Sequence, residues 1–239
     1  MNGLRAQRLT YDTLERLRVG RPVDRLSFIA DLCRGKHVLD IGCLDETALM
    51  KRDTEHWLHG RIGTVAREVV GVDSSDKIPA EGLRTGDHAM IFKGDGVDPK
   101  APALHDEQIE EIVAGEFIEH IEAPLEFFRN MKRRFPGREL VISTPNGVSF
   151  ANTLLGTIGR EVQHPDHIQI FSYKILNTLC MRAGFADWTI IPYRFYATEM
   201  ILQSAGAKRT AVRFVQGLVR MVERFFPLLC FGYVVRVRL

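Results

Sequence analysis

The chain lacks the features that would place it in a membrane, outside the cell or on a nucleic acid. Its four cysteines form no CxxC pair, so we expect a reduced protein without a structural metal site. No run of about 18 apolar residues occurs, and the first residues show no apolar core of a signal peptide. The formal net charge is only +2, which gives no support for a polyanionic partner. We therefore expect a cytoplasmic protein that binds no nucleic acid.

What the chain does contain is an alternation of strand and helix patterns over 239 residues, 45% of them hydrophobic. This suits one α/β domain. We expect strands at 37–41, 69–73, 88–93, 111–114, 139–143, 186–193 and 231–237. We expect helices at 4–19 (one or two short ones), 23–34, 46–68, 76–86 (broken), 123–134, 172–184 and 208–225, and a loop at 147–170. Crossovers of this kind predict a doubly wound, mostly parallel sheet.

Acidic residues follow four consecutive predicted strands: Asp40, Asp73, Asp95 and Glu116. Ligands of open α/β sheets bind beyond the carboxyl ends of the strands. A carboxylate after the second strand can accept hydrogen bonds from both ribose hydroxyls, and one after the third can accept from an adenine amino group. Each acid alone is explained as a helix N-cap, but the set in register indicates a nucleoside-binding edge.

Several motifs add to this reading, between about residues 36 and 190. They are Val38-Leu39-Asp40-Ile41-Gly42-Cys43, Val70-Gly71-Val72-Asp73, Gly94-Asp95, Glu116-Phe117-Ile118-Glu119-His120-Ile121, Ser143-Thr144-Pro145-Asn146, His167-Ile168-Gln169-Ile170-Phe171-Ser172 and Ala183-Gly184-Phe185. Together they resemble the class I S-adenosylmethionine-dependent methyltransferases, in particular the small-molecule enzymes related to those of ubiquinone and menaquinone biosynthesis. The resemblance implies a seven-stranded Rossmann-like sheet with an antiparallel last strand.

The resemblance also implies a domain division and a cofactor site. Residues 1–35 would form helices covering the cleft, and 36–239 would form the methyltransferase domain, with a helical insertion at about 195–226. In the site, Gly42 and Cys43 would approach the methionine part of the cofactor, Asp73 with the adjacent Ser74 would hold the ribose, Asp95 and Gly96 would border the adenine, and Gly115 and Glu116 would line the floor beside the sulfonium. Asp40 completes this predicted set.

The loop after the first strand departs from the family pattern. The usual second and third glycines are replaced by Leu44 and Glu46, although only glycine easily allows positive φ and close backbone approach. A catalytically degenerate member that acts as a binding or scaffold protein is therefore an alternative. An NAD-linked dehydrogenase is disfavoured, because no Gly-x-Gly-x-x-Gly follows the first strand.

Three histidines are candidate catalytic residues for a hydroxyl acceptor, which needs a base. His120 follows the fourth strand, and His164 and His167 lie in the loop after the fifth. An unperturbed pKa of about 6.5 lets histidine accept a proton at neutral pH. No metal-ligand spacing such as His-Glu-x-x-His is present, so we predict no metal. Each histidine could equally be structural.

The basic helix at 208–225 could be a lid, a contact in a homodimer, a membrane-surface element or an ordinary packed helix. We expect an S-adenosylmethionine-dependent methyltransferase that acts on a small molecule: a sugar, a lipid-linked glycan or a secondary metabolite. Oxygen is slightly preferred over nitrogen or carbon as the acceptor atom.

Overall fold

The computed structural model describes residues 9–44, 48–52, 54–100, 104–161 and 164–239. The strands are β1 (His37–Ile41), β2 (Glu68–Asp73), β3 (Leu83–Gly86), β4 (Ala89–Lys93), β5 (Glu111–Gly115), β6 (Glu139–Pro145), β7 (Trp188–Tyr193) and β8 (Gly232–Arg238). The helices are α1 (Arg25–Leu32), α2 (Ala48–Lys51), α3 (Leu58–Gly63), α4 (Pro124–Arg134), α5 (Phe150–Thr157), α6 (Tyr173–Arg182), α7 (Thr198–Leu202) and α8 (Gly206–Phe225), with the short 3₁₀ turns η1 (Asp106–Gln108) and η2 (Pro227–Leu229).

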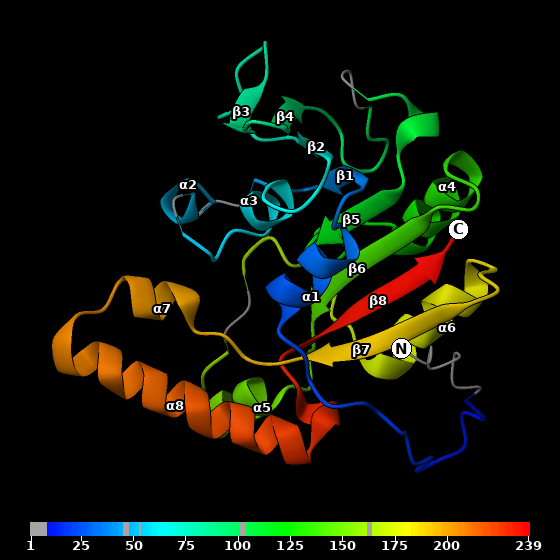
Figure 1. Ribbon diagram of the computed structural model, residues 1–239. Coiled ribbons are helices and arrows are strands. Elements are labelled where there is room, and N and C mark those ends of the chain that lie inside the picture. The colour runs from blue at the N-terminus through cyan, green and yellow to red at the C-terminus, as the bar shows by residue number, and fades with distance from the viewer. Residues whose placement is uncertain (1–8, 45–47, 53, 101–103, 162–163) are drawn as a thin grey trace.

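The strands form one twisted sheet in the order β3-β4-β2-β1-β5-β6-β8-β7 (Figure 1). Strands β1, β2, β4, β5 and β6 are parallel to their neighbours in this set, whereas β8 runs antiparallel to β6 and β7. The chain winds outward in both directions from β1 and β5. The predicted Rossmann-like fold class is confirmed, and the sheet has eight strands because β3 is added at its edge.

Alternating side chains along the buried strands build a core on each face of the sheet. Leu39 packs in the cluster that contains Phe128 of α4 and Leu176 of α6. Its neighbour Val38 packs in the opposite cluster, with Ile29 of α1 and Ile62 of α3. Because side chains point alternately to the two faces of a strand, these helices cover opposite faces, as Figure 1 shows. The carboxyl edge of the parallel strands is left for a ligand.

The helix expected at 4–19 is wrong for the described part of that range, residues 9–19, which form no helix. Tyr11 and Leu14 have positive φ values of 59° and 63°. The Glu15 carboxylate accepts hydrogen bonds from the backbone N–H groups of Thr10 and Tyr11. Local side-chain to backbone bonds of this kind compete with helix formation. The predicted helical cover of the cleft is therefore not built by this segment, and residues 4–8 lie outside the described residues.

Three other local predictions are corrected by pairing or capping. The broken helix expected at 76–86 is wrong: residues 76–82 form turns without a helix, and residues 83–86 form β3, which pairs antiparallel with β4. The helix expected at 46–68 is two short helices, α2 and α3. The expected loop at 147–170 contains α5, whose first turn is capped by the Ser149 side chain accepting from the N–H of Asn152. The remaining predicted strands and helices occur within a few residues of their expected bounds.

Candidate active site

The site lies where β1 and β5 separate the two halves of the sheet. These strands are parallel neighbours whose following connections lead in opposite directions, which is the point where ligands bind in open α/β folds. Two groups of residues meet there. One follows β1, β2 and β4 and is called here the cofactor half; the other follows β5 and β6 and is called the acceptor half.

The turn after β1 requires its glycine. Gly42 has a φ of 66°, and its N–H donates to the carbonyl of Val72 at 2.9 Å. A Cβ at Gly42 would lie 2.6 Å from Cδ2 of Phe117, and a Cβ at Gly96 would lie 2.7 Å from the same ring. The ring of Phe117 thus fits between two glycines. Sequence reasoning missed Phe117, because only the folded chain brings the segment after β5 against these turns.

Asp73 is the best-connected acid of the cofactor half. Its side chain is buried, and its two oxygens accept hydrogen bonds at 2.9 Å from the backbone N–H groups of Leu44 and Ser75. These bonds fix the carboxylate and the loop after β1 to each other.

Leu44 explains how the loop manages without the family's second glycine. Its side chain is buried in a small apolar cluster with Trp57 and Ile91, so it points into the protein. Glu46 lies outside the described residues. Ser74 and Asp95 are exposed at the same edge, and Asp95 accepts from the N–H of Val97 at 2.8 Å.

Asp40 and Cys43, both predicted to serve the cofactor, face inward. Asp40 is buried, and its Oδ2 lies 2.9 Å from Nδ1 of His59, whose Nε2 is 3.0 Å from the Thr85 hydroxyl. Burial, followed by the charge of Asp40, raises the pKa of the Cys43 thiol well above its ordinary value. Ligand atoms of Asp40, Cys43 and His59 lie within 4.8 Å of one another and could hold a metal ion, but a thiolate would first have to form there.

The acceptor half begins with a strained residue. Glu116 directly follows β5 and has a φ of 54°, an unusual conformation for a residue other than glycine. Its Oε1 accepts from the Tyr193 hydroxyl at 3.0 Å and lies 3.6 Å from Nη1 of Arg25. Arg25 also donates to the Ser143 hydroxyl. Such over-determined strain is typical of functional sites. A Cβ at neighbouring Gly115 would lie 2.7 Å from Cδ2 of Leu58, so the Leu58 side chain would have to shift.

Glu119 is the second residue that sequence reasoning did not select. It is only 1% exposed, and neither of its carboxylate oxygens has a hydrogen-bond partner among the described residues. Burial, followed by the charge of Glu116, raises the pKa of Glu119 well above its ordinary value. Burying an unpaired charged carboxylate costs free energy. Binding a proton or a ligand would relieve that cost. The signal in the sequence was the second acid of Glu116-Phe117-Ile118-Glu119.

The three predicted catalytic histidines come together beside Glu119. The ring centroids of His120 and His167 are 4.6 Å apart, and that of His164 lies 6.1 Å from His120 and 5.7 Å from His167. Burial, followed by the nearby His120, lowers the pKa of His167 below its ordinary value. This lowered pKa favours the neutral imidazole, which is the form that can accept a proton.

The same groups have the chemistry of a cation site. Ligand atoms of Glu119, His120 and His167 lie within 4.8 Å of one another. Neutral imidazole and carboxylate are ordinary ligands of divalent transition metals. These residues come from two segments far apart in the sequence, so no metal-ligand spacing in the sequence predicts the group.

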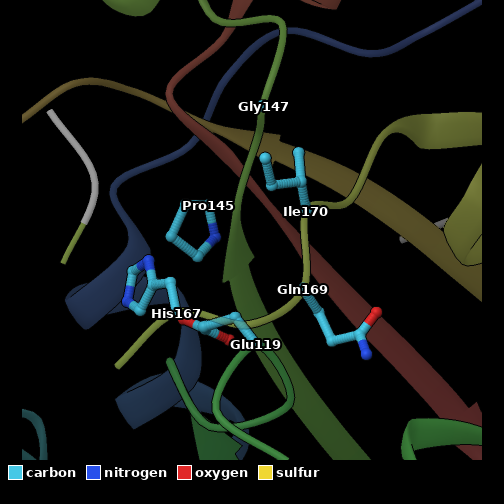
Figure 2. Close-up of a pocket in the computed structure, with 6 residues that line it drawn as sticks. All are labelled: Glu119, Pro145, Gly147, His167, Gln169 and Ile170. Atoms are coloured by element: carbon cyan, nitrogen blue, oxygen red, sulfur yellow. The ribbon is translucent and has the colours of Figure 1, made fainter. Parts of the chain in front are cut away.

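A small hollow opens next to this cluster. Figure 2 shows Glu119 and His167 side by side below Pro145, with Gly147 and Ile170 above and Gln169 turning its amide away. The hollow is smaller than the roughly 300–1,000 Å³ of typical ligand pockets.

The fold and this edge define a Rossmann-like α/β protein that binds its ligand at the switch point of the sheet. Residues 11–190 match the family described as methyltransferase domain. The match covers most of the chain, which therefore belongs to this family: it is a class I S-adenosylmethionine-dependent methyltransferase, and S-adenosylmethionine is its cofactor. No curated protein matches the sequence.

Solved structures are similar in fold. A SAM-dependent methyltransferase from Archaeoglobus fulgidus is 17% identical, with a TM-score of 0.53 over 90% of this chain and 91% of that one. An S-adenosylmethionine-dependent methyltransferase from Mesorhizobium loti is 16% identical, with a TM-score of 0.54 over 90% of this chain and 96% of that one. The small RNA methyltransferase HEN1 is 16% identical, with a TM-score of 0.54 over 94% of this chain and 27% of that one. No helix in the described part of the chain has the length and apolar character needed to cross a membrane.

The cofactor half fits this cofactor. The turn after β1 has the positive φ that glycine allows, and the Asp73 carboxylate is already oriented by two backbone donors. The exposed carboxylate of Asp95 follows the adjacent strand β4. Polar acceptors at neighbouring strand ends are what a nucleoside with free hydroxyl and amino groups requires.

Proposed function

We propose that the protein methylates a hydroxyl oxygen of a small molecule, such as a sugar, a lipid-linked glycan or a secondary metabolite. The observation that carries the proposal is the cluster of His120, His164, His167 and the unpaired Glu119 beside Gly115 and Glu116. We also place the protein with the small-molecule methyltransferases related to the ubiquinone and menaquinone enzymes, which its motifs resemble. A homodimer remains a prediction.

The roles in the site follow from the chemistry of each group. S-adenosylmethionine supplies an electrophilic methyl group on a sulfonium. Asp73 with Ser74 holds the ribose, Asp95 and Gly96 border the adenine, and Gly42, Cys43, Gly115 and Glu116 line the methionine part, while Asp40 pairs with His59. The carboxylates around this cleft favour a cation by charge.

A hydroxyl acceptor must lose its proton as the new O–C bond forms. The lowered pKa of His167 favours its neutral form, and His167 lies beside the hollow, so it takes that proton in our proposal. The charge of Glu116, which acts to raise the pKa of His167, then stabilises the protonated imidazole. An amine acceptor would not need this cluster to the same degree, because a neutral amine is already nucleophilic.

The first test is isothermal titration calorimetry with S-adenosylhomocysteine, with NAD as the comparison ligand. We expect micromolar binding of S-adenosylhomocysteine alone. If neither ligand binds, the proposal fails in favour of a degenerate methyltransferase fold that acts as a scaffold.

The second test measures transfer of a radiolabelled methyl group from S-adenosylmethionine to a panel of catechols and hexoses, with anilines of the same skeleton as controls. We expect labelled ethers, and an at least 100-fold lower rate for His167→Asn with unchanged S-adenosylhomocysteine affinity. Labelled anilines without ethers would overturn the choice of oxygen. Loss of the rate in EDTA, with recovery in Mn²⁺, would show instead that a cation held by Glu119, His120 and His167 lowers the pKa of the hydroxyl.

A further inference from the structure

Helix α8 turns an apolar stripe away from the protein. Phe214, Leu218, Met221 and Phe225 recur at spacings of four, three and four residues, which places them on one side of a helix. All four are exposed, Phe214 by 67% and Phe225 by 70%. The buried side chains of α8 are Val219 and Glu223. An amphipathic helix of a globular protein normally buries its apolar stripe, so this stripe lacks its usual cover.

Neighbouring elements extend the stripe into a face. Helix α5 packs against α8, along the lower edge of the molecule in Figure 1. It has no buried residue; its Leu154 is exposed, and so is Ile158, which follows the helix. Phe226 follows α8 directly and is 60% exposed, and Leu228 of η2 comes next. We call the exposed apolar side chains of α5, Ile158, α8, Phe226 and η2 the apolar face. Exposed apolar side chains gathered on packed elements are typical of an interaction site.

The charges on these elements have one sign. Helix α8 carries five basic residues: Lys208, Arg209, Arg213, Arg220 and Arg224. Its one acidic residue is Glu223, which is buried and accepts the N–H of Phe195 at 2.8 Å. Helix α5 and η2 contain no charged residue. The exposed charged residues of these elements, Lys208, Arg209, Arg213 and Arg224, are therefore all basic.

This combination selects the occupant. In a symmetric pair of copies joined through α8, the arginines of the two helices would be brought together with no exposed acid on α8 to oppose them, and like charges in proximity are unfavourable. A bilayer with anionic headgroups offers both an apolar layer for the phenylalanines and negative charge for the arginines. Helices with this composition lie in the plane of such an interface.

We propose that α5 and α8 dock the protein on an anionic membrane surface, with Phe214 and Phe225 inserted between the headgroups. The residues just before α5 connect the apolar face to the hollow of the active site. Val148, exposed by 55%, follows the hollow residue Gly147, and the hollow residue Ile170 is 57% exposed. A docked protein thus presents the mouth of the hollow close to the lipid. Docking itself does not depend on the proposed methylation, and it is measured without it.

The experiment is co-sedimentation of the full chain with phosphatidylcholine vesicles and with vesicles containing 40% phosphatidylglycerol. We expect at least tenfold tighter binding to the anionic vesicles, weakened by 0.5 M salt. The double variant Phe214→Ser/Phe225→Ser should lose at least tenfold in binding, and Arg213→Ala/Arg224→Ala should lose the preference for anionic lipid. Ile175→Ser/Met181→Ser on α6, which removes exposed apolar side chains outside the apolar face, should bind like the wild type.

Circular dichroism spectra and melting temperatures establish that each variant is folded, and sedimentation velocity gives its oligomeric state. Equal binding to both vesicle types, or no binding by the folded wild type, would overturn the proposal. A dimer that dissociates in Phe214→Ser/Phe225→Ser but binds no vesicles would identify a second copy as the occupant and also overturn it. S-adenosylhomocysteine binding, measured in parallel, separates failure of docking from failure of the proposed activity.

Discussion

The two halves of the active-site edge differ in the hydrogen bonding of a buried acidic side chain. In the cofactor half, Asp73 has both oxygens hydrogen-bonded to backbone N–H groups. In the acceptor half, Glu119 is at least as buried but has no hydrogen-bond partner among the described residues. The cofactor half is thus arranged before its ligand arrives, whereas the acceptor half retains an electrostatic cost that a proton or a ligand relieves.

The contrast follows from what surrounds each carboxylate. Asp73 lies where two turns present free N–H groups, and a carboxylate that accepts several N–H bonds is stabilised in its charged form. Glu119 lies beside Glu116, whose charge opposes its ionisation. Glu116 itself is compensated by Arg25 and Tyr193. Backbone N–H groups therefore orient a binding carboxylate at little cost in free energy. A site that transfers protons instead requires side chains held in unfavourable surroundings.

The largest expected effect is on cofactor binding by Asp73→Ala. This change removes the acceptor of both backbone bonds and of the proposed ribose bonds, so affinity for S-adenosylhomocysteine should fall at least 100-fold, about 2.7 kcal/mol. Calorimetry measures it. Asp95→Ala is the matched control: Asp95 is exposed, and we expect a loss of tenfold or less. Equal losses for the two variants would contradict the special place of Asp73.

A smaller effect, a gain in folding stability rather than a loss of binding, is expected for Glu119→Gln. The folded-state pKa of Glu119 is raised, so its contribution to stability is complete below the ordinary glutamate pKa and is lost as pH rises through the folded value. The neutral amide removes that loss. At pH 8 the variant should be more stable than the wild type by about 2 kcal/mol, and at pH 4.5 the gain should vanish.

Urea unfolding at both pH values measures this gain. Glu122→Gln, in the same segment but exposed, is the matched control and should be neutral. A Glu119→Gln variant that is less stable than the wild type at pH 8 would mean that the carboxylate is paired in the protein, and the contrast between the two halves would disappear.

The smallest effect is expected for Glu223→Gln. The hydrogen bonding of the Glu223 carboxylate is intermediate between that of Asp73 and that of Glu119. One oxygen of Glu223 accepts the N–H of Phe195, and the other has no partner among the described residues. Burial raises the pKa of Glu223 to about 7, so its stabilising contribution is lost as pH rises from about 4.5 through 7. We expect the variant to gain about 1 kcal/mol at pH 8, seen as a higher melting temperature. A gain larger than that of Glu119→Gln would reverse the series.

Much of the fold was predictable because its signals are local. The apolar runs of β1, β2 and β5 and the apolar spacing of α4 are readable in short windows, and Ser172 caps α6 as expected. The turn segment at 9–19 and strand β3 were missed. The first depends on bonds from Glu15 to the backbone, and the second on pairing with the edge of β4. Neither interaction leaves a periodic pattern.

The candidate site was predictable to the same extent. Acids after successive parallel strands must meet at one edge, so Asp73, Asp95 and Glu116 could be selected without a structure. Asp40 follows the same pattern but turns inward to His59. Phe117, Arg25 and Tyr193 were not selected, because their positions depend on contacts between segments far apart in the chain.

The sequence by itself determined the order of strands and helices, the glycine turn after β1 and the row of acids, because each arises from the chemistry of neighbouring residues. Only the tertiary structure decided which acids are satisfied, how three histidines meet beside Glu119, and that the apolar stripe of α8 faces outward. Periodicity tells which side chains share a face of a helix. What that face touches depends on how the whole chain packs.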